Sequence, residues 1–88
     1  MNAARAVRGI QTEGGAVLQN TENGATFSTN LAGARIWKYI TKGSTKDEIV
    51  DQLSTEFDVP KERVDGDVEE FVKALKHRGL LEGDVSRD

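Results

Sequence analysis

The chain has 88 residues and a mass of 9.6 kDa, the size of one small domain, and 36% of its residues are hydrophobic, enough for a modest core. It contains no cysteine and a single histidine, His77, which excludes disulfides, thiolate metal sites, cysteine nucleophiles and histidine-rich metal sites. No apolar run reaches the roughly 20 residues that span a bilayer, and the N-terminus lacks a signal-peptide core. We therefore expect one cytoplasmic domain spanning residues 1–88, ordered from about residue 6 to about residue 82, that does not enter a membrane.

The charge is unevenly distributed along the chain, although the net charge is only −3. Residues 1–43 carry five basic and two acidic residues, whereas residues 44–70 carry ten acidic and three basic residues. Acidic first turns of two helices would account for this pattern, because the helix dipole favours negative charge there. An acidic surface for a basic partner would account for it as well, so both interpretations stay open.

The first third of the chain predicts an antiparallel sheet. Two short runs with β-branched and aromatic residues, 15–20 and 25–29, flank the pair Asn23-Gly24. An Asn-Gly pair between such runs is a strong signal for a tight hairpin turn. The segment 6–11 can add a third strand ahead of this hairpin.

The hairpin turn also predicts which residues face each other. A two-residue turn at Asn23-Gly24 places Leu18 opposite Thr29 and Asn20 opposite Phe27. Side chains alternate between the two faces of a strand, so this pairing puts Leu18 and Phe27 on one face, which we expect to be the core face.

The remainder of the chain predicts three helices. Asn30 is a suitable N-cap for a first helix that ends near Gly43, and Thr45 with Glu48 forms a capping box for a second. Pro60 suits the first position of a third helix. Apolar residues recur along these segments at the three- and four-residue steps that form one face of a helix.

The third helix should end at Gly79, with Leu80 and Leu81 folding back onto the core, and the polar residues from Glu82 to Asp88 should fray. The expected fold class is therefore α+β. A three-stranded antiparallel sheet is followed by a bundle of three helices, in a winged-helix-like arrangement.

The residues do not form a catalytic constellation. A triad needs a base beside its nucleophile, and His77 falls in the last turn of the third predicted helix, where a surface position is expected. The glycines match no phosphate-binding spacing, and helix starts account for the paired carboxylates. We therefore expect a binding module that is not an enzyme and uses no cofactor or metal.

A winged-helix DNA-binding regulator is the alternative function, because such folds often read DNA with one helix. The first half of the third helix would be the reader, and it carries two basic against five acidic residues. Repulsion from the phosphates opposes this function, so we expect no nucleic-acid partner.

The last predicted strand, 25–29, has one free side in a three-stranded meander. Its unpaired N–H and C=O groups can receive an incoming strand, and the third helix can supply a wall for that strand's apolar side chains. A covered edge in a purely structural domain, or an adaptor that docks elsewhere, fits the residues as well.

The order of motifs resembles the PqqD family, and the similarity covers about residues 8–82. It rests on Gly15-Ala16-Val17-Leu18-Gln19-Asn20, Asn23-Gly24, Asn30-Leu31, Gly33-Ala34-Arg35-Ile36-Trp37, Gly43-Ser44-Thr45, Glu48-Ile49, Leu53, Phe57-Asp58-Val59, Asp67-Val68, Phe71-Val72, Leu75 and Gly79-Leu80-Leu81. Members of this family are precursor-peptide recognition elements of ribosomally made, post-translationally modified peptides. The resemblance implies three strands, three helices, and a leader peptide bound as an added strand beside the third helix.

Carried over by position, the resemblance implies a peptide-binding site on the last strand and the third helix. The expected site residues are Ala25, Thr26, Phe27, Ser28, Thr29, Val64, Asp67, Val68, Phe71 and Ala74. The Asn-Gly hairpin and the segment around Trp37 are most similar to the free-standing proteins of lasso-peptide clusters. The implied enzyme partner is then a separate leader cysteine protease, or a radical enzyme if the pathway makes a quinone cofactor.

Overall fold

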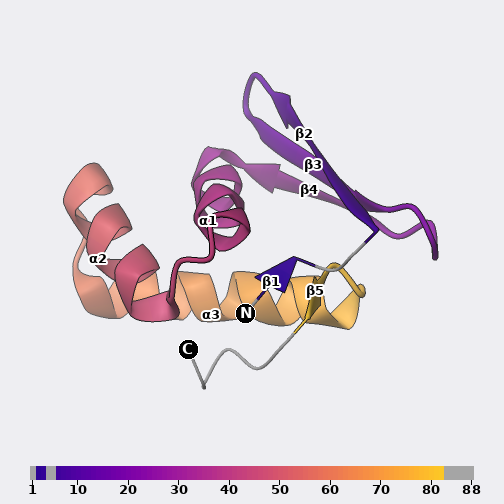
Figure 1. Ribbon diagram of the computed structural model, residues 1–88. Coiled ribbons are helices and arrows are strands. Elements are labelled where there is room, and N and C mark those ends of the chain that lie inside the picture. Colours follow the sequence, from indigo (N-terminus) through magenta and orange to yellow (C-terminus); the bar gives the residue numbers. More distant parts are fainter. Residues whose placement is uncertain (1, 4–5, 83–88) are drawn as a thin grey trace.

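The computed structural model describes residues 2–3 and 6–82. A three-stranded antiparallel sheet is followed by three helices, as the sequence predicts (Figure 1). The strand order is β2-β3-β4. The elements are β2 (Val7–Thr12), β3 (Gly15–Asn20), β4 (Thr26–Asn30), α1 (Leu31–Thr41), α2 (Lys46–Phe57) and α3 (Lys61–His77).

A second, two-stranded pairing joins the ends of the chain and was not predicted. Strand β1 (Asn2–Ala3) lies antiparallel to β5 (Leu81–Glu82). Glu82, predicted to fray, is therefore part of a strand, and the rest of the predicted frayed segment, 83–88, lies outside the described residues. Such a pairing depends on residues 78 and 80 positions apart, which no local pattern encodes.

The predicted register of the β3–β4 hairpin is wrong by two residues. Leu18 pairs directly with Phe27, and the Asn20 N–H donates to the Ala25 carbonyl at 2.9 Å, so the loop has four residues. The cause is the Asn20 side chain, whose Oδ1 accepts the backbone N–H groups of Glu22 and Asn23 at 2.9 and 3.1 Å. A shift of two residues preserves the alternation of faces, so Leu18 and Phe27 share one face as predicted.

The helix ends follow the predicted capping residues. The Asn30 side chain accepts the Gly33 N–H, and Thr45 and Glu48 form the capping box. Gly79 ends α3 in a left-handed conformation with φ of 72°, as expected for a C-terminal glycine. The prediction for Pro60 needs one correction: Pro60 is the N-cap, so α3 begins at Lys61.

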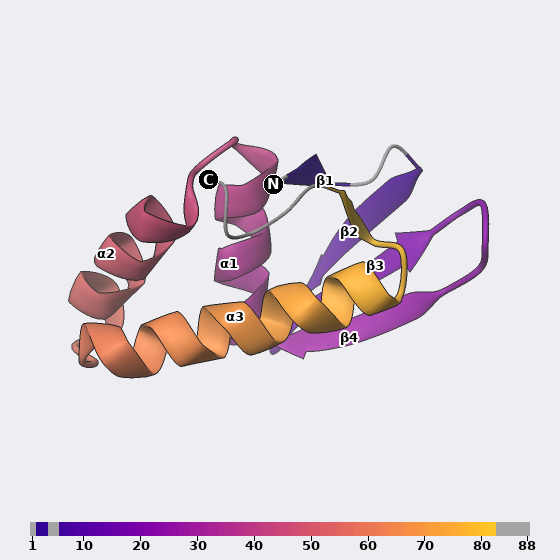
Figure 2. The ribbon, with the colours of Figure 1, turned by 90° about the horizontal axis from the view of Figure 1, so that it is seen from below.

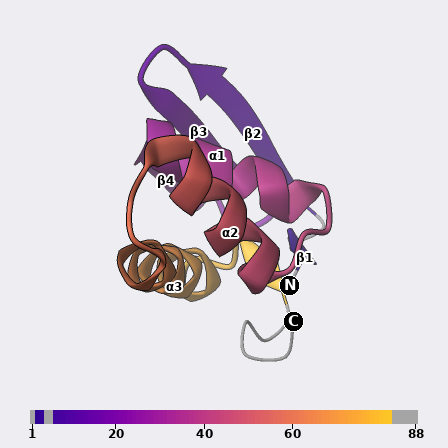
Figure 3. The same ribbon diagram turned by 90° about the vertical axis from the view of Figure 1, so that its left-hand side faces the viewer.

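The hydrophobic core lies between the sheet and the helices. Helix α1 packs on β3 and β4, and α2 packs against the N-terminal part of α3, which is seen end-on in Figure 3. The fully buried side chains include Leu18, Ile40 and Leu75, and both Leu80 and Leu81 are buried as predicted.

Four of the ten acidic residues of 44–70 form ion pairs between helices. Lys61 Nζ lies 2.7 Å from Asp51 Oδ1, and this hydrogen bond raises the pKa of Lys61 above its ordinary value. Lys46 Nζ reaches Asp65 on α3 at 3.1 Å, and Arg35 of α1 reaches Glu56 of α2 at 2.9 Å. These ion pairs join the helices to one another and account for part of the uneven charge.

Candidate functional site

Strand β4 lies at the edge of the three-stranded sheet, with β3 as its only neighbour among the described strands. The bond from Asn20 to Ala25 sets the alternation of the antiparallel ladder. Phe27 and Thr29 therefore turn their backbone groups toward β3, whereas Thr26 and Ser28 turn theirs away from the sheet. The free edge thus presents N–H and C=O groups at every second residue.

Helix α3 runs alongside this edge (Figure 2), and a hollow of about 400 Å³ lies between them. We call this hollow the edge groove. Both sides contribute an aromatic ring, because Phe27 of β4 and Phe71 of α3 meet edge to face with centroids 5.7 Å apart. The residues that line the groove are Phe27, Asn30, Ala32, Gly33, Ile36, Asp67, Glu70, Phe71 and Ala74.

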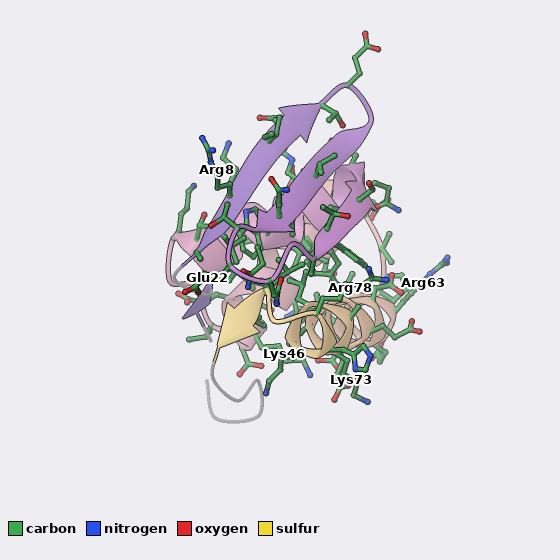
Figure 4. The ribbon with its side chains drawn as sticks, turned by 90° about the vertical axis from the view of Figure 1, so that its right-hand side faces the viewer. Arg8, Glu22, Lys46, Arg63, Lys73 and Arg78 are labelled. Atoms are coloured by element: carbon green, nitrogen blue, oxygen red, sulfur yellow. The ribbon has the colours of Figure 1, made fainter. Side chains whose placement is uncertain are left out.

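One end of the edge groove is bounded by Arg78, the residue after α3. Its Nη1 donates to the Thr26 carbonyl at 3.0 Å, and its guanidinium lies 5.1 Å from the centroid of the Phe27 ring. In Figure 4 the Arg78 label lies on the side of α3 that faces the sheet, and the Lys73 label lies on the opposite side. The groove therefore has a basic group at its Thr26 end, and Asp67 and Glu70 along its helix wall.

The predicted site residues divide between this groove and other places. Phe27, Asp67, Phe71 and Ala74 line it, and Thr26 and Ser28 lie on the free edge beside it. The Ala25 carbonyl accepts the Asn20 N–H, and Thr29 turns its backbone groups toward β3. The backbone groups of both residues therefore take part in the β3–β4 pairing and are not on the free edge.

Two of the predicted site residues lie in the core. Val68 is fully buried and Val64 is 6% exposed, so neither side chain lines the edge groove. Val64 lies near the N-terminus of α3, where α2 packs. Val68 belongs to the buried row of α3 side chains that includes Val72 and Leu75. The sequence pattern could not separate these positions from Phe71, because all of them share the apolar side of one helix.

Several residues of the groove were not predicted. Gly33 is buried where α1 begins, and a Cβ there would overlap the Thr29 side chain and lie 3.0 Å from Phe71. Glu70 lies three residues after Asp67, and residues at this spacing share one side of a helix, so the sequence itself could have placed Glu70 beside Asp67. No local signal distinguishes Arg78 from the other basic residues near the end of α3.

The described residues do not contain a group of three or more His, Cys, Asp or Glu side chains that could hold a metal ion. Within the same residues, no helix is both long and apolar enough to span a bilayer. His77 is exposed in the last turn of α3, as predicted.

Residues 15–81 match the family model described as "Coenzyme PQQ synthesis protein D (PqqD)". The chain belongs to the PqqD family. This family assignment agrees with the resemblance found in the sequence, and the matched region contains β3, β4, the three helices and every residue that lines the edge groove.

Two solved structures are similar to this PqqD-family chain. One is described as "TbiB1 in Complex with the TbiA(beta) Leader Peptide"; it has 32% identity and a TM-score of 0.88, with 96% of this chain and 98% of that chain covered. The other, "Lasso peptide synthetase B1 complexed with the leader peptide", has 22% identity and a TM-score of 0.83, covering 93% and 96% of the two chains. A comparison with curated proteins finds no match.

Proposed function

We propose that this PqqD-family chain is a non-catalytic module that binds the leader peptide of a ribosomally made, modified peptide and presents it to a separate maturation enzyme. The observation that carries this proposal is the free edge of β4 beside an apolar groove. The likeness to TbiB1, a structure that holds a leader peptide, supports it further.

The leader would bind as an added strand. Its backbone would pair with Ser28 and its neighbours on the free edge, which gives affinity without reading the sequence of the leader. Alternate side chains of an extended peptide point to the same side, so every second leader residue would face the edge groove. Phe27, Phe71 and Ile36 would select apolar side chains there.

Of the two similar structures, the one named as a lasso peptide synthetase B1 supports a lasso-peptide pathway over a quinone-cofactor pathway. On this proposal the partner enzyme is a leader cysteine protease, and the chain itself supplies binding and orientation only. A radical enzyme would be the partner if the precursor belonged to a quinone pathway.

The substitution Ser28→Pro tests this function directly. Proline removes the Ser28 N–H, which points away from the sheet, so we expect the affinity for leader peptide to fall about tenfold or more. Calorimetric titration with the TbiA(beta) leader, and with a leader-like peptide selected on the unchanged chain from a displayed library, measures this change.

The matched control is Gln11→Pro, because Gln11 turns its N–H outward at the opposite edge of the sheet, on β2. We expect this variant to bind as the unchanged chain does. Equal binding by the unchanged chain and by a folded Ser28→Pro variant would contradict strand addition at β4.

A further inference from the structure

Arg78 is held in place from two directions. The C-terminal turn of α3 closes with a bond from the Leu80 N–H to the Leu75 carbonyl at 2.8 Å, which fixes the backbone on both sides of Gly79. From the hairpin loop, the Asn20 side chain donates to the Gly79 carbonyl at 2.7 Å and Asn23 to the Arg78 carbonyl at 3.5 Å. The loop between β3 and β4 and the end of α3 are thereby tied together.

The Arg78 side chain uses a backbone group that an added strand would need. Thr26 is one of the β4 residues whose C=O points away from β3, and the Arg78 guanidinium already donates to that oxygen at 3.0 Å. The guanidinium also lies against the Phe27 ring, so its position is fixed by two contacts. A guest strand that enters along Ser28 meets this group at Thr26.

The guanidinium retains donors for the guest. Arginine carries several N–H groups in a planar fork, and the bond to Thr26 uses one of them. The charged residues in the lining of the edge groove are Asp67 and Glu70, so Arg78 supplies the positive charge at this end. A fixed guanidinium with free donors preferentially binds a carboxylate.

We propose that Arg78 ends the ladder of the guest strand at Thr26 and binds a side-chain carboxylate of the guest at that point. This inference rests on the proposed function, which it deepens by naming a position and a chemical class in the leader. Arg78 is thus a specificity-determining residue of the edge groove.

The prediction that the added ladder ends at Thr26 is tested by amide hydrogen exchange, followed by NMR. The probe is a peptide of about twelve residues, selected on the unchanged chain from a displayed random library and blocked at both ends. We expect binding to slow exchange at the Ser28 amide and to leave the Thr26 amide unprotected. In the Arg78→Ala variant, protection should extend to Thr26.

The carboxylate is tested with the same peptide after each Asp or Glu is replaced by Asn or Gln. One such replacement should weaken binding to the unchanged chain about tenfold or more, and it should have no effect on Arg78→Ala. The control is Lys73→Ala, which removes the same charge from the side of α3 that faces away from the sheet (Figure 4) and should behave as the unchanged chain. Blocked ends ensure that the carboxylate comes from a side chain.

The outcomes separate this inference from the proposed function. If both amides are protected in the unchanged chain, the added ladder does not end at Thr26. If the acidic replacements weaken binding to the Arg78→Ala variant as much as binding to the unchanged chain, Arg78 does not bind the carboxylate. If the Ser28 amide stays unprotected, or no peptide is selected, strand addition itself fails and this inference fails with it. Arg78→Ala removes one exposed bond to Thr26 and one contact with Phe27, so it should lower the unfolding midpoint only slightly and leave the chain folded, which the same samples verify.

Discussion

Val64 and Phe71 lie on nearly the same line of α3, two turns apart, and yet they serve different purposes. At about 100° per residue, seven steps return to within about 20° of the starting direction, so a helical projection cannot distinguish them. The difference comes from which elements pack against α3 at each of these two positions along its axis. Val64 lies where α2 covers the helix, whereas Phe71 lies where β4 and the start of α1 leave the edge groove open.

The substitution Val64→Asp should therefore destabilise the fold rather than act on binding alone. It places a charge at a position that is 6% exposed, and we expect the free energy of unfolding to fall by about 3 kcal/mol or more. Urea denaturation followed by circular dichroism measures this loss.

The control for Val64→Asp is Asp67→Asn, one turn further along α3 and exposed at the edge groove. It should change the free energy of unfolding by no more than about 0.5 kcal/mol. A Val64→Asp variant that keeps its stability but loses leader binding would place Val64 in the groove and contradict the packing described above.

The junction between β4 and α1 shapes the groove through the close approach of three elements. Asn30 ends the strand and caps the helix, and Gly33 lets the first turn of α1 press against Thr29 and Phe71. The cap could be predicted because its partners are three residues apart. The need for glycine could not, because Phe71 is 38 positions further along the chain.

The substitution Gly33→Ala should disturb this junction. Its Cβ would overlap the Thr29 side chain and crowd the Phe71 ring, so we expect a loss of about 1–3 kcal/mol in the free energy of unfolding and weaker leader binding. Thermal unfolding and a peptide titration measure the two effects.

Gly66 offers a matched control for Gly33→Ala, because it is an exposed glycine within α3 whose added Cβ would meet nothing within 4 Å. Gly66→Ala should raise the stability by up to about 1 kcal/mol, since alanine is the better helix former. If both substitutions stabilise the chain, the contact of Gly33 with Phe71 is not tight.

The arrangement of charge over the folded chain argues against a nucleic-acid partner. The helix that a winged-helix protein would insert into DNA carries Asp67 and Glu70 on its exposed side, and these two residues face the edge groove. The ion pairs of Lys46 and Lys61 with acidic neighbours further reduce the positive charge available on α2 and α3. The same surface suits a peptide held by backbone pairing and apolar contacts.

A salt titration distinguishes these two partners. Binding of the selected peptide should weaken by less than about tenfold between about 50 and about 200 mM salt, because few charged contacts form. A protein that makes 6–10 phosphate contacts loses roughly 10³–10⁵ in affinity over that range. Fluorescence anisotropy with a labelled peptide and a labelled DNA duplex measures both, and tight, salt-sensitive binding of the duplex would contradict the proposed function.

Features whose partners are close in the chain could be predicted from the sequence: the order of three strands and three helices, the caps at Asn30 and Thr45, the end of α3 at Gly79, and the shared face of Leu18 and Phe27. The family followed from the same ordered motifs.

Features that depend on residues distant in the chain were decided by the tertiary structure. The register of the hairpin follows from the Asn20 side chain, which also reaches Gly79, 59 positions away. The division of α3 into core and groove residues depends on where α2 stops covering it. The bond of Arg78 to Thr26 joins the end of α3 to β4, across 52 positions of the chain. Periodicity records which residues share a face of a helix, but only packing determines what that face meets.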